Sequence, residues 1–382
     1  MEPAGPLVGA TAVPGDKSVS HRAVLLNTLA TGEARIRGLS TGEDVAATVA
    51  ACRALGATIT PESDGDPGCW RIVAPDRLAE PDRVLDCGNS GTSIRLLLGA
   101  LAPGPGLAVL TGDDSLRRRP MDRVVEPLRA MGASIDGRDG GRRAPLAVRG
   151  RPLAACDHDL PIASAQLKSA LLLAGLGCGV RIREPRPSRD HTERMLRAMG
   201  ARLTEHRDDR LTPGEADGPP WLSLAPGPLR AVDVDVPGDL SAAAFLLVAG
   251  AIVPGSTVTI TGVGVNPTRT GVIDVLRAMG ADLEVIPRPS AGGEPLADLV
   301  VRASPLRGVE IAGTLALRSL DELVVLAIAA ATADGTTTVR DAAELRVKES
   351  DRIALVAETG PDFAALFCGC IYAGAWPVPL PL

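Results

Sequence analysis

Basic and hydroxyl side chains gather at points where a loop turns into a helix. The segment 14–22, PGDKSVSHR, places Lys17 and Ser18 at such a start and Arg22 about one turn further along. The N-terminus of a helix offers free N–H groups and a partial positive charge, which together favour a bound anion. A capped helix with two solvated cations has the same pattern, so both interpretations stay open for this segment alone.

A second loop of this kind spans residues 86–95, DCGNSGTSIR. Two glycines around Asn-Ser let a ligand approach the backbone closely, while Thr92 and Arg95 add a hydroxyl and a guanidinium. The segment 116–121, LRRRPM, then carries three arginines before another expected helix. A run of charges is usually a solvated surface, unless other observations direct one arginine inward.

Three later segments also begin helices with polar groups. Residues 164–169, SAQLKS, and 188–195, SRDHTERM, are by themselves typical of capping boxes. Asp321 heads a strongly apolar helix, where an acid is either a partner for the helix dipole or a desolvated base. Residues 345–352, LRVKESDR, form another charged helix start.

The elements that position these groups repeat along the chain. One phrase occurs four times, as RALGA at 53–57 and as RAMGA at 129–133, 197–201 and 277–281. Each phrase ends an apolar helix with glycine and leads into an alternating run typical of a strand. The chain is therefore predicted to consist of strand-and-helix units, which need their neighbours to bury their apolar faces.

Each unit is also expected to open with a capping residue and an apolar helix. These helices are predicted at 18–29, 90–101, 164–176, 241–253 and 319–331. The closing phrase does not recur after the fifth opening, and no sixth opening follows. Five recognisable repeats with a missing sixth indicate an interrupted array.

Residue usage changes towards the C-terminus. Trp70, Trp221 and Phe245 are the aromatic residues before position 358, whereas the other four fall in the segment 363–376. We therefore expect residues 358–382 to be an atypical tail of different origin. An ordinary apolar C-terminal strand and turn is the alternative.

Bulk properties exclude several classes of function. The net charge of -6 gives no support for nucleic acid or an anionic membrane as the main partner. No apolar run reaches the roughly 18–20 residues of a membrane span, and the first residues lack a signal-peptide pattern. The seven scattered cysteines favour reduced thiols in a cytoplasmic protein over a disulfide framework. P-loop, dinucleotide and HExxH motifs are not found, and no metal site is expected.

Together these motifs resemble those of the enolpyruvyl transferases, and among them the 5-enolpyruvylshikimate-3-phosphate synthases. The resemblance rests on PGDKSVSHR, NSGTSIR, LRRRPM, SAQLKSALL, SRDHTERM, NPTRTG at 266–271 and LRVKESDR, in the family's order and approximate spacing. It implies an α/β fold of two domains, each built from three βαβαββ repeats. Residues 16–230 would form the complete domain, and residues 1–15 plus 231–357 an incomplete, discontinuous one.

The resemblance also implies a reaction. The enolpyruvyl (carboxyvinyl) group of phosphoenolpyruvate would be transferred to the 5-hydroxyl of shikimate 3-phosphate with release of phosphate, a step of the shikimate pathway of chorismate and aromatic amino acid biosynthesis. It implies no cofactor, and a cytoplasmic monomer whose partners are these two small molecules. Both substrates are strongly anionic, which would explain why basic residues lie at the starts of the helices.

Matching motif positions assigns roles to individual residues. Asp321 would take the proton from the attacking hydroxyl, and Glu349, together with Lys17, would serve proton transfer at the methylene carbon. Phosphoenolpyruvate would be held by Lys17, Thr92, Arg119 and Arg352. Shikimate 3-phosphate would be held by Ser18, Arg22, Ser164, Gln166, Arg189 and Lys348. Asn89, Gly91 and Ala165 complete the predicted substrate-binding set. By the same resemblance, Gly91 leaves room where a methyl would intrude into the phosphoenolpyruvate pocket, and a completed chain is expected to be a glyphosate target.

The sequence departs from the family's pattern near its C-terminus. The family's last repeat carries an Asp-His-Arg segment and a later lysine that reach phosphoenolpyruvate, and neither has a counterpart in this sequence. Each charge-assisted contact is worth about 1.5–3 kcal/mol, so we expect severely impaired or absent turnover. Residues 358–382 instead faintly resemble a stretch of acyl-adenylate-forming ligases.

Three alternatives remain open at this point. The sister family that acts on UDP-N-acetylglucosamine typically has asparagine after the motif lysine and a reactive cysteine before the second helix. Here Ser18 follows Lys17, and residues 111–121 contain no cysteine. A non-catalytic remnant that binds shikimate 3-phosphate through residues 16–230 is the second alternative, and a fragment of an adenylate-forming ligase is the third.

Overall fold

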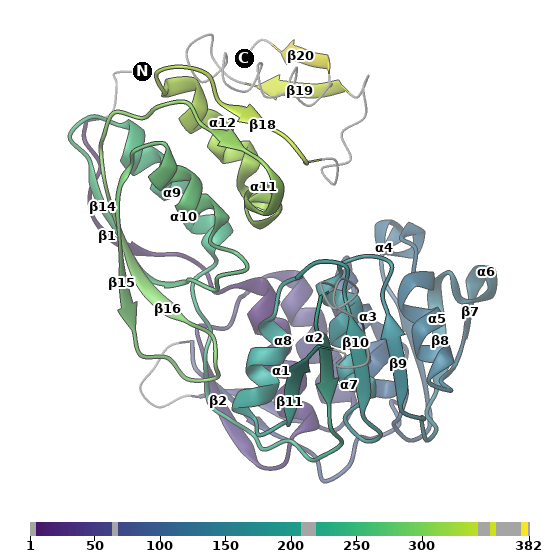
Figure 1. Cartoon of the computed structure of the whole chain (residues 1–382). Coiled ribbons are helices and arrows are strands. Elements are labelled where there is room, and N and C mark those ends of the chain that lie inside the picture. The colour runs from purple at the N-terminus through teal and green to yellow at the C-terminus, as the bar shows by residue number, and fades with distance from the viewer. Residues whose placement is uncertain (1–4, 63–67, 208–218, 343–351, 357–375, 381–382) are drawn as a thin grey trace. The chain divides into compact units, whose positions relative to one another are not determined.

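The computed structural model describes residues 5–62, 68–207, 219–342, 352–356 and 376–380 of the 382-residue chain (Figure 1). The chain divides into two compact units. Unit 1 consists of Met1–Pro14, Gly238–Pro289 and Pro295–Leu382, and unit 2 consists of Gly15–Pro237 and Ser290–Glu294. The domain boundaries that the sequence analysis expected from the repeats remain a prediction.

Unit 2 contains three four-stranded sheets of one topology. The first consists of β13 (Val234–Asp235), β2 (Glu33–Arg37), β4 (Trp70–Val73) and β3 (Thr58–Pro61). The second consists of β5 (Leu85–Asp86), β6 (Leu107–Thr111), β8 (Arg143–Arg149) and β7 (Ser134–Gly137). The third consists of β9 (Cys156–Asp159), β10 (Val180–Arg183), β12 (Trp221–Leu224) and β11 (Leu203–His206). In each, the first pair is parallel and the other two pairs are antiparallel.

Each sheet of unit 2 is accompanied by two principal helices. The first helices are α1 (Lys17–Leu29), α3 (Gly91–Leu101) and α7 (Ala165–Ala174). The second helices are α2 (Glu43–Ala54), α5 (Asp122–Ala130) and α8 (His191–Ala198), with short helices α4 (Asp114–Arg118) and α6 (Arg138–Gly141) in the second repeat. The first helices are buried over most of their length, including every residue from Val19 to Thr28 of α1. The predicted α/β fold of βαβαββ repeats is confirmed.

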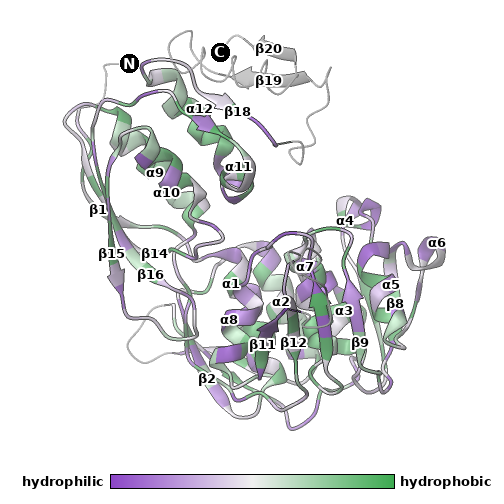
Figure 2. Cartoon of the chain, viewed as in Figure 1, coloured by the Kyte–Doolittle hydropathy of each residue, from purple (hydrophilic) through white to green (hydrophobic). Residues whose placement is uncertain are grey.

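Unit 1 holds a fourth sheet of the same topology, formed by β1 (Val8–Ala12), β14 (Thr257–Gly264), β16 (Leu296–Arg302) and β15 (Asp282–Arg288). Its helices are α9 (Leu240–Ile252), α10 (Gly271–Ala278), α11 (Gly313–Arg318), the 3-10 turn η1 (Leu320–Glu322) and α12 (Leu323–Thr332). Figure 2 shows how apolar α9 and α12 are. Two further parallel pairs are β17 (Glu310–Ile311) with β18 (Thr338–Val339), and β19 (Arg352–Val356) with β20 (Trp376–Leu380).

The first strand of two repeats comes from a distant part of the chain. In unit 2, β13 pairs in parallel with β2, so that Val234 lies opposite Ile36. In unit 1, the N-terminal strand β1 pairs in parallel with β14, so that Val8 lies opposite Thr257. Each of these sheets is therefore completed only by a long-range strand pairing.

The repeated phrase forms the same helix end four times. Its glycine has a positive φ in every copy, 98° at Gly56, 99° at Gly132, 90° at Gly200 and 95° at Gly280. The N–H of the alanine that follows bonds to the carbonyl five residues earlier, over 2.9–3.1 Å. This is the Schellman arrangement, for which glycine is favoured because it has no Cβ. The sequence prediction of a glycine stop is therefore correct.

The arginine of the phrase ties the helix end to the strand that follows. Arg53 and Arg129 donate to the carbonyl oxygens of Ile59 and Ile135, and Arg277 donates to that of Leu283. Arg197 instead forms an ion pair of 3.1 Å with Glu205. The long side chain thus satisfies a strand carbonyl in three of the four copies.

Three of the five expected helix caps differ in the structure. The helix expected from Ser319 begins as α12 only at Leu323, after η1, and the Ser319 hydroxyl donates to the Leu315 carbonyl over 2.7 Å instead of capping it. Asp16, rather than Ser18, accepts the Val19 N–H over 2.8 Å and caps α1. Asp239, rather than Ser241, caps α9. The carboxylates lie two residues earlier than the expected serines and reach the free N–H groups first. Ser90 and Ser164 cap α3 and α7 as predicted.

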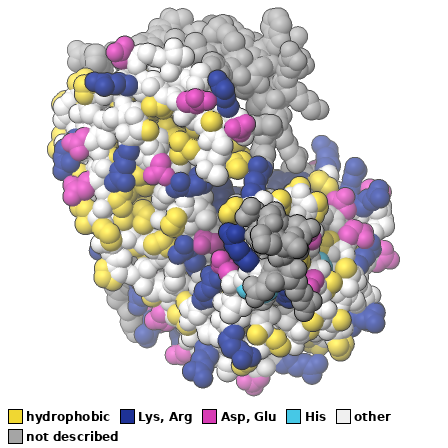
Figure 3. All heavy atoms as spheres, in the orientation of Figure 1, with side chains coloured by type: hydrophobic (Ala, Val, Ile, Leu, Met, Phe, Trp, Pro, Cys, Tyr) yellow, Lys and Arg dark blue, Asp and Glu magenta, His cyan; other side chains and the backbone are white. Residues whose placement is uncertain are grey.

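Figure 3 shows basic and acidic side chains interspersed on the face in view. Within the described parts of the chain, no helix is long and apolar enough to cross a bilayer.

Candidate functional site

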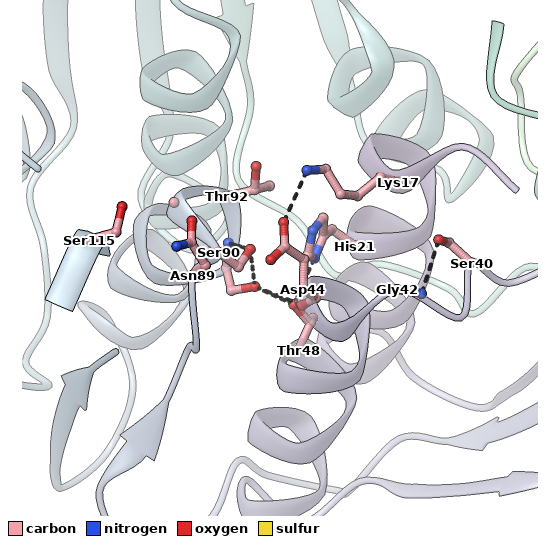
Figure 4. A network of polar contacts seen from close by, with 12 residues as sticks. Lys17, His21, Ser40, Gly42, Asp44, Thr48, Asn89, Ser90, Thr92 and Ser115 are labelled. Carbon is pink, nitrogen blue, oxygen red and sulfur yellow. Dashed lines mark hydrogen bonds and ion pairs between the residues drawn. The ribbon is translucent and has the colours of Figure 1, made fainter. Parts of the chain in front are cut away.

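In unit 2, the predicted residues Lys17 and Thr92 lie near the starts of α1 and α3, close to the start of α2 (Figure 4). The Lys17 ammonium forms an ion pair of 3.0 Å with Asp44, the second residue of α2. The Lys17 side chain is 54% exposed, and an exposed pair of this kind contributes little to stability. The ammonium can therefore exchange its carboxylate partner for an anionic ligand at small cost.

Gly91 lies between two guanidinium groups. A Cβ at this position would come within 2.7 Å of Nη1 of Arg95 and 3.1 Å of Nη1 of Arg119. Arg119 also donates to Oδ1 of Asn89, whose Nδ2 donates to Asp113 over 2.7 Å. Among the three arginines in LRRRPM, Arg119 thus donates a hydrogen bond to the glycine loop, and its contact with phosphoenolpyruvate stays a prediction.

Arg95 joins this loop to the third repeat. It is 4% exposed, and its Nη1 donates to Oε1 of Gln166 over 2.7 Å. Gln166 in turn donates to the Thr92 hydroxyl over 3.0 Å. Burial, together with the charges of Arg123 and Arg119, lowers the pKa of Arg95 to about 10. Cationic neighbours around a buried guanidinium create a positive potential that a bound anion would relieve.

A buried chain of hydrogen bonds links the helices α1, α2 and α3 (Figure 4). His21 Nδ1 lies 2.7 Å from the Thr48 hydroxyl, which lies 2.7 Å from that of Ser93. Ser93 donates to the Ser90 hydroxyl over 2.7 Å. Burial, with a smaller contribution from Arg22, lowers the pKa of His21 to about 3. His21 is therefore neutral in the physiological pH range.

Arg22 is buried among protein groups of its own unit. Its Nε donates to Thr192 over 2.7 Å, its Nη1 to the Ser18 carbonyl over 2.8 Å and its Nη2 to Ser169 over 2.9 Å. Burial lowers the pKa of Arg22, although the Glu193 carboxylate opposes this shift. The guanidinium thus links α1 to α7 and α8. Its predicted contact with a substrate stays a prediction.

Hydrogen bonds join the predicted binding residues of unit 2 in separate small groups, among them Thr92 with Gln166, Asn89 with Arg119 and Ser18 with Arg22. Gln166 joins the α7 start, with Ser164 and Ala165, to Thr92 and Arg95 at the start of α3. Arg189 precedes α8 and is half-buried, and its charge contributes to the lowered pKa of Arg22.

In unit 1, the predicted base Asp321 lies in η1 with its side chain 46% exposed. Arg269, which is buried, donates to Asp321 over 3.0 Å and to the Ser241 hydroxyl over 2.7 Å. Two more carboxylates lie 3.6 Å from this guanidinium, those of Asp239 and Glu322. Several carboxylates thus share one buried cation.

Three predicted residues cannot be placed at a site. Lys348 and Glu349 lie outside the described residues. Arg352 begins β19, but its side chain is also outside the described part of the structure.

Among the residues that sequence reasoning missed are two that form ion pairs with predicted site residues. Asp44 was not singled out, since Glu43 and Asp44 at a helix start are typical of ordinary dipole partners. Arg269 lies within the segment NPTRTG, which was used for the resemblance without a role for its arginine. The sequence alone does not reveal either contact, because the partner of each residue is distant along the chain.

Comparisons with known proteins agree with the family resemblance and with the α/β fold. The family model described as EPSP synthase (3-phosphoshikimate 1-carboxyvinyltransferase) matches residues 1–359. A 3-phosphoshikimate 1-carboxyvinyltransferase from Anaeromyxobacter sp. (strain Fw109-5) is 52% identical, over 98% of this chain and 85% of the relative. One from Gloeobacter violaceus (strain ATCC 29082 / PCC 7421) is 55% identical, over 94% and 81%. The solved EPSP synthase from Acinetobacter baumannii has a TM-score of 0.81 at 42% identity, over 91% of this chain and 77% of that one.

These matches do not show that residues 358–382 have a different origin. The family model ends at residue 359, whereas the alignment with the Anaeromyxobacter relative covers 98% of the chain. In the structure, residues 376–380 of this segment form β20 and pair with β19. The foreign tail stays a prediction.

Proposed function

The chain belongs to the EPSP synthase (3-phosphoshikimate 1-carboxyvinyltransferase) family, a family of transferases, and we propose how its described residues serve that reaction. The observation that carries the proposal is the position of Gly91 between the guanidinium groups of Arg95 and Arg119, at the N-terminus of a buried helix. The relatives' names favour none of the three alternatives, which are a non-catalytic remnant, an enzyme for UDP-N-acetylglucosamine and a fragment of an adenylate-forming ligase.

Phosphoenolpyruvate binds against this positive loop. Its carboxylate and phosphate replace Asp44 as partners of Lys17 and contact Arg119 and Thr92. Charge-assisted contacts of this kind are short and strong, and they are strengthened where water is excluded. Without a bound anion, the positive charges around this loop repel one another. Binding of phosphoenolpyruvate therefore stabilises the loop.

Shikimate 3-phosphate binds at the starts of α1, α7 and α8. Ser18, Ser164 and Gln166 offer hydroxyl and amide groups for its ring hydroxyls and phosphate, and Arg189 offers a guanidinium. Arg22 contributes the N–H groups that its protein partners leave available, since a guanidinium has five.

Asp321 accepts the proton of the attacking hydroxyl, and Arg269 orients the carboxylate for this step. Glu349 and Lys17 then serve proton transfer at the methylene carbon, and phosphate leaves. General acid–base steps of this kind contribute about 100- to 10,000-fold each. Lys348 and Arg352 complete the binding set, and the monomeric state and cytoplasmic location are further parts of the proposal.

The test is phosphate release by the purified 382-residue chain with both substrates. Asp321→Ala is the control for catalysis, because it removes the carboxylate while leaving unit 2 unchanged. Turnover that depends on Asp321 supports the proposal and contradicts the expectation of impaired activity. Binding of shikimate 3-phosphate without turnover would support the binding roles in unit 2 and the expected impairment. No binding of either substrate would contradict the proposal.

A further inference from the structure

A buried cluster of three charged side chains, Lys168, Glu184 and Glu193, lies next to the starts of α7 and α8. The Lys168 ammonium is 2.7 Å from a carboxylate oxygen of Glu184 and 2.7 Å from one of Glu193. The three side chains are 6%, 9% and 5% exposed. Burial lowers the pKa of Lys168, but the charges of Glu193 and Glu184 outweigh it, and the net pKa is above its ordinary value. Lys168 is therefore a fixed cation and unsuited to act as a base.

Glu184 connects two segments that carry predicted substrate-binding residues. One of its oxygens, Oε1, accepts the backbone N–H of Ser164 over 3.0 Å. The other, Oε2, accepts the hydroxyl of Ser188 over 2.9 Å in addition to the ammonium of Lys168. Ser164 begins the segment with Ala165 and Gln166, and Ser188 directly precedes Arg189. One buried carboxylate thus fixes both segments.

The remaining charges hold the two helices together from the other side. Lys168 lies in the first turn of α7 and Glu193 in the first turn of α8. Beside them, the hydroxyls of Ser169 and Thr192 are 2.6 Å apart. The backbone N-terminal turns of α7 and α8 therefore have little freedom to move apart while the cluster is intact.

Stability alone is a poor explanation for this cluster. The desolvation of buried ions offsets much of their attraction, and apolar side chains of similar size often stabilise a protein as well or better. A site that must hold polar groups in one geometry gains more from fixed supporting contacts.

We propose that Glu184 is a positioning residue for shikimate 3-phosphate. Through its direct contacts to the Ser164 N–H and the Ser188 hydroxyl it holds these two segments in their binding geometry without touching the substrate, and Lys168 fixes its carboxylate. This inference rests on the proposed function, in which these segments bind that substrate. It gives the lysine of the SAQLKS segment a supporting role and adds a residue, Glu184, that belongs to none of the sequence motifs.

The first test is Glu184→Gln in the full 382-residue chain. Glutamine has the same size and can still accept the Ser164 N–H, but it has no charge for Lys168 and can no longer accept both contacts at its second terminal atom. We expect the dissociation constant of shikimate 3-phosphate, measured by titration calorimetry, to rise roughly tenfold. In steady-state assays, the KM for this substrate should rise similarly, while the KM for phosphoenolpyruvate changes less than about twofold.

Asp159→Asn is the matched control. It makes the same change from carboxylate to amide at the end of β9, beside the end of β10 that Glu184 directly follows, in an exposed ion pair with Arg183. Ser188→Ala is a milder second variant, which removes the hydroxyl contact to Glu184 without leaving a buried charge unpaired. It should weaken shikimate 3-phosphate binding about threefold, and the Asp159→Asn variant should bind it as the parent does.

Amide hydrogen exchange decides the positioning independently of any substrate. In Glu184→Gln, exchange at residues 164–166 and 188–191 should become faster while the sheets of unit 2 remain as protected as in the parent. Unchanged exchange in both segments, or equal losses for the two substrates, would overturn the inference. If the parent itself fails to bind shikimate 3-phosphate, the proposed function is wrong, and faster exchange confined to these segments would still support the structural role of Glu184.

Discussion

The guanidinium of Arg269 donates to the carboxylate of Asp321 over 3.0 Å, a contact between the segment before α10 and the turn before α12. Arg269 is buried and Asp321 is nearly half exposed. A rigid cation therefore orients a carboxylate that remains accessible to a substrate hydroxyl. The pair links a residue with a proposed catalytic role to one that sequence reasoning had not assigned.

Asp321→Asn should abolish most of the turnover while preserving the fold. The amide oxygen can still accept from Arg269, but an amide cannot take up the proton of the attacking hydroxyl. We expect phosphate release to fall by about 100- to 10,000-fold, with shikimate 3-phosphate binding unchanged by calorimetry. Turnover within a few-fold of the parent would contradict the assignment of Asp321 as the base.

Gly91→Ala should weaken phosphoenolpyruvate binding without unfolding the chain. Gly91 is the first residue of α3 and has no positive φ, so the backbone there accepts alanine without strain. The added Cβ would come within 2.7 Å of Nη1 of Arg95, so the guanidinium must move. We expect the KM for phosphoenolpyruvate to rise roughly tenfold and inhibition by glyphosate to weaken in a chain that is active.

Gly99→Ala in the same helix is the matched control for that prediction. Its Cβ would come within 2.2 Å of the backbone oxygen of Ala170, which cannot rotate away. It should lower the free energy of unfolding by about 1–3 kcal/mol through overpacking. Unchanged phosphoenolpyruvate KM and glyphosate inhibition in Gly91→Ala would contradict the proposed position of that substrate.

His21 should make the free energy of unfolding depend on pH in the acid range. The pKa of His21 in the folded chain is about 3, against an ordinary value of 6.5, so between these values the unfolded chain binds a proton that the folded chain does not. Stability is therefore lost as the pH falls from 6.5 towards 3, by at most about 1.4 kcal/mol per pH unit from this residue. Nothing is lost above pH 6.5, where both states are neutral.

His21→Asn isolates this effect, because asparagine can bond to Thr48 but does not titrate. Urea unfolding of parent and variant between pH 4 and 7.5 should give a smaller slope of stability with pH for the variant, by up to one proton. Parallel curves would show that His21 titrates normally in the folded chain.

Gly132→Ala should destabilise unit 2 through the backbone alone. A Cβ there has no atom within 4 Å, but φ is 99°, a conformation that residues with a side chain rarely adopt. We expect a loss of about 1–2 kcal/mol. Gly177→Ala also meets no atom within 4 Å and has no positive φ, so it should change the urea midpoint little. Equal midpoints for the two variants would refute the role assigned to the repeated phrase.

The sequence by itself determined the repeat, the helix ends and the groups that could bind anions. Helix stops such as Gly56 and Gly132 could be predicted because a Schellman end depends on a few consecutive residues and on the freedom of glycine. The ordered motifs also predicted the family and the α/β fold correctly. These features are local, or repeat locally, and so they leave a pattern in the chain.

Only the tertiary structure decided which groups meet. It pairs Lys17 with Asp44, buries Arg22 between α7 and α8, and makes Glu184 the common partner of Ser164 and Ser188. A charged residue has the same identity whether it is solvated, paired or in contact with a ligand, and the surrounding elements select among these states. Those elements are assembled by long-range strand pairings such as that of β13 with β2, which no local pattern records.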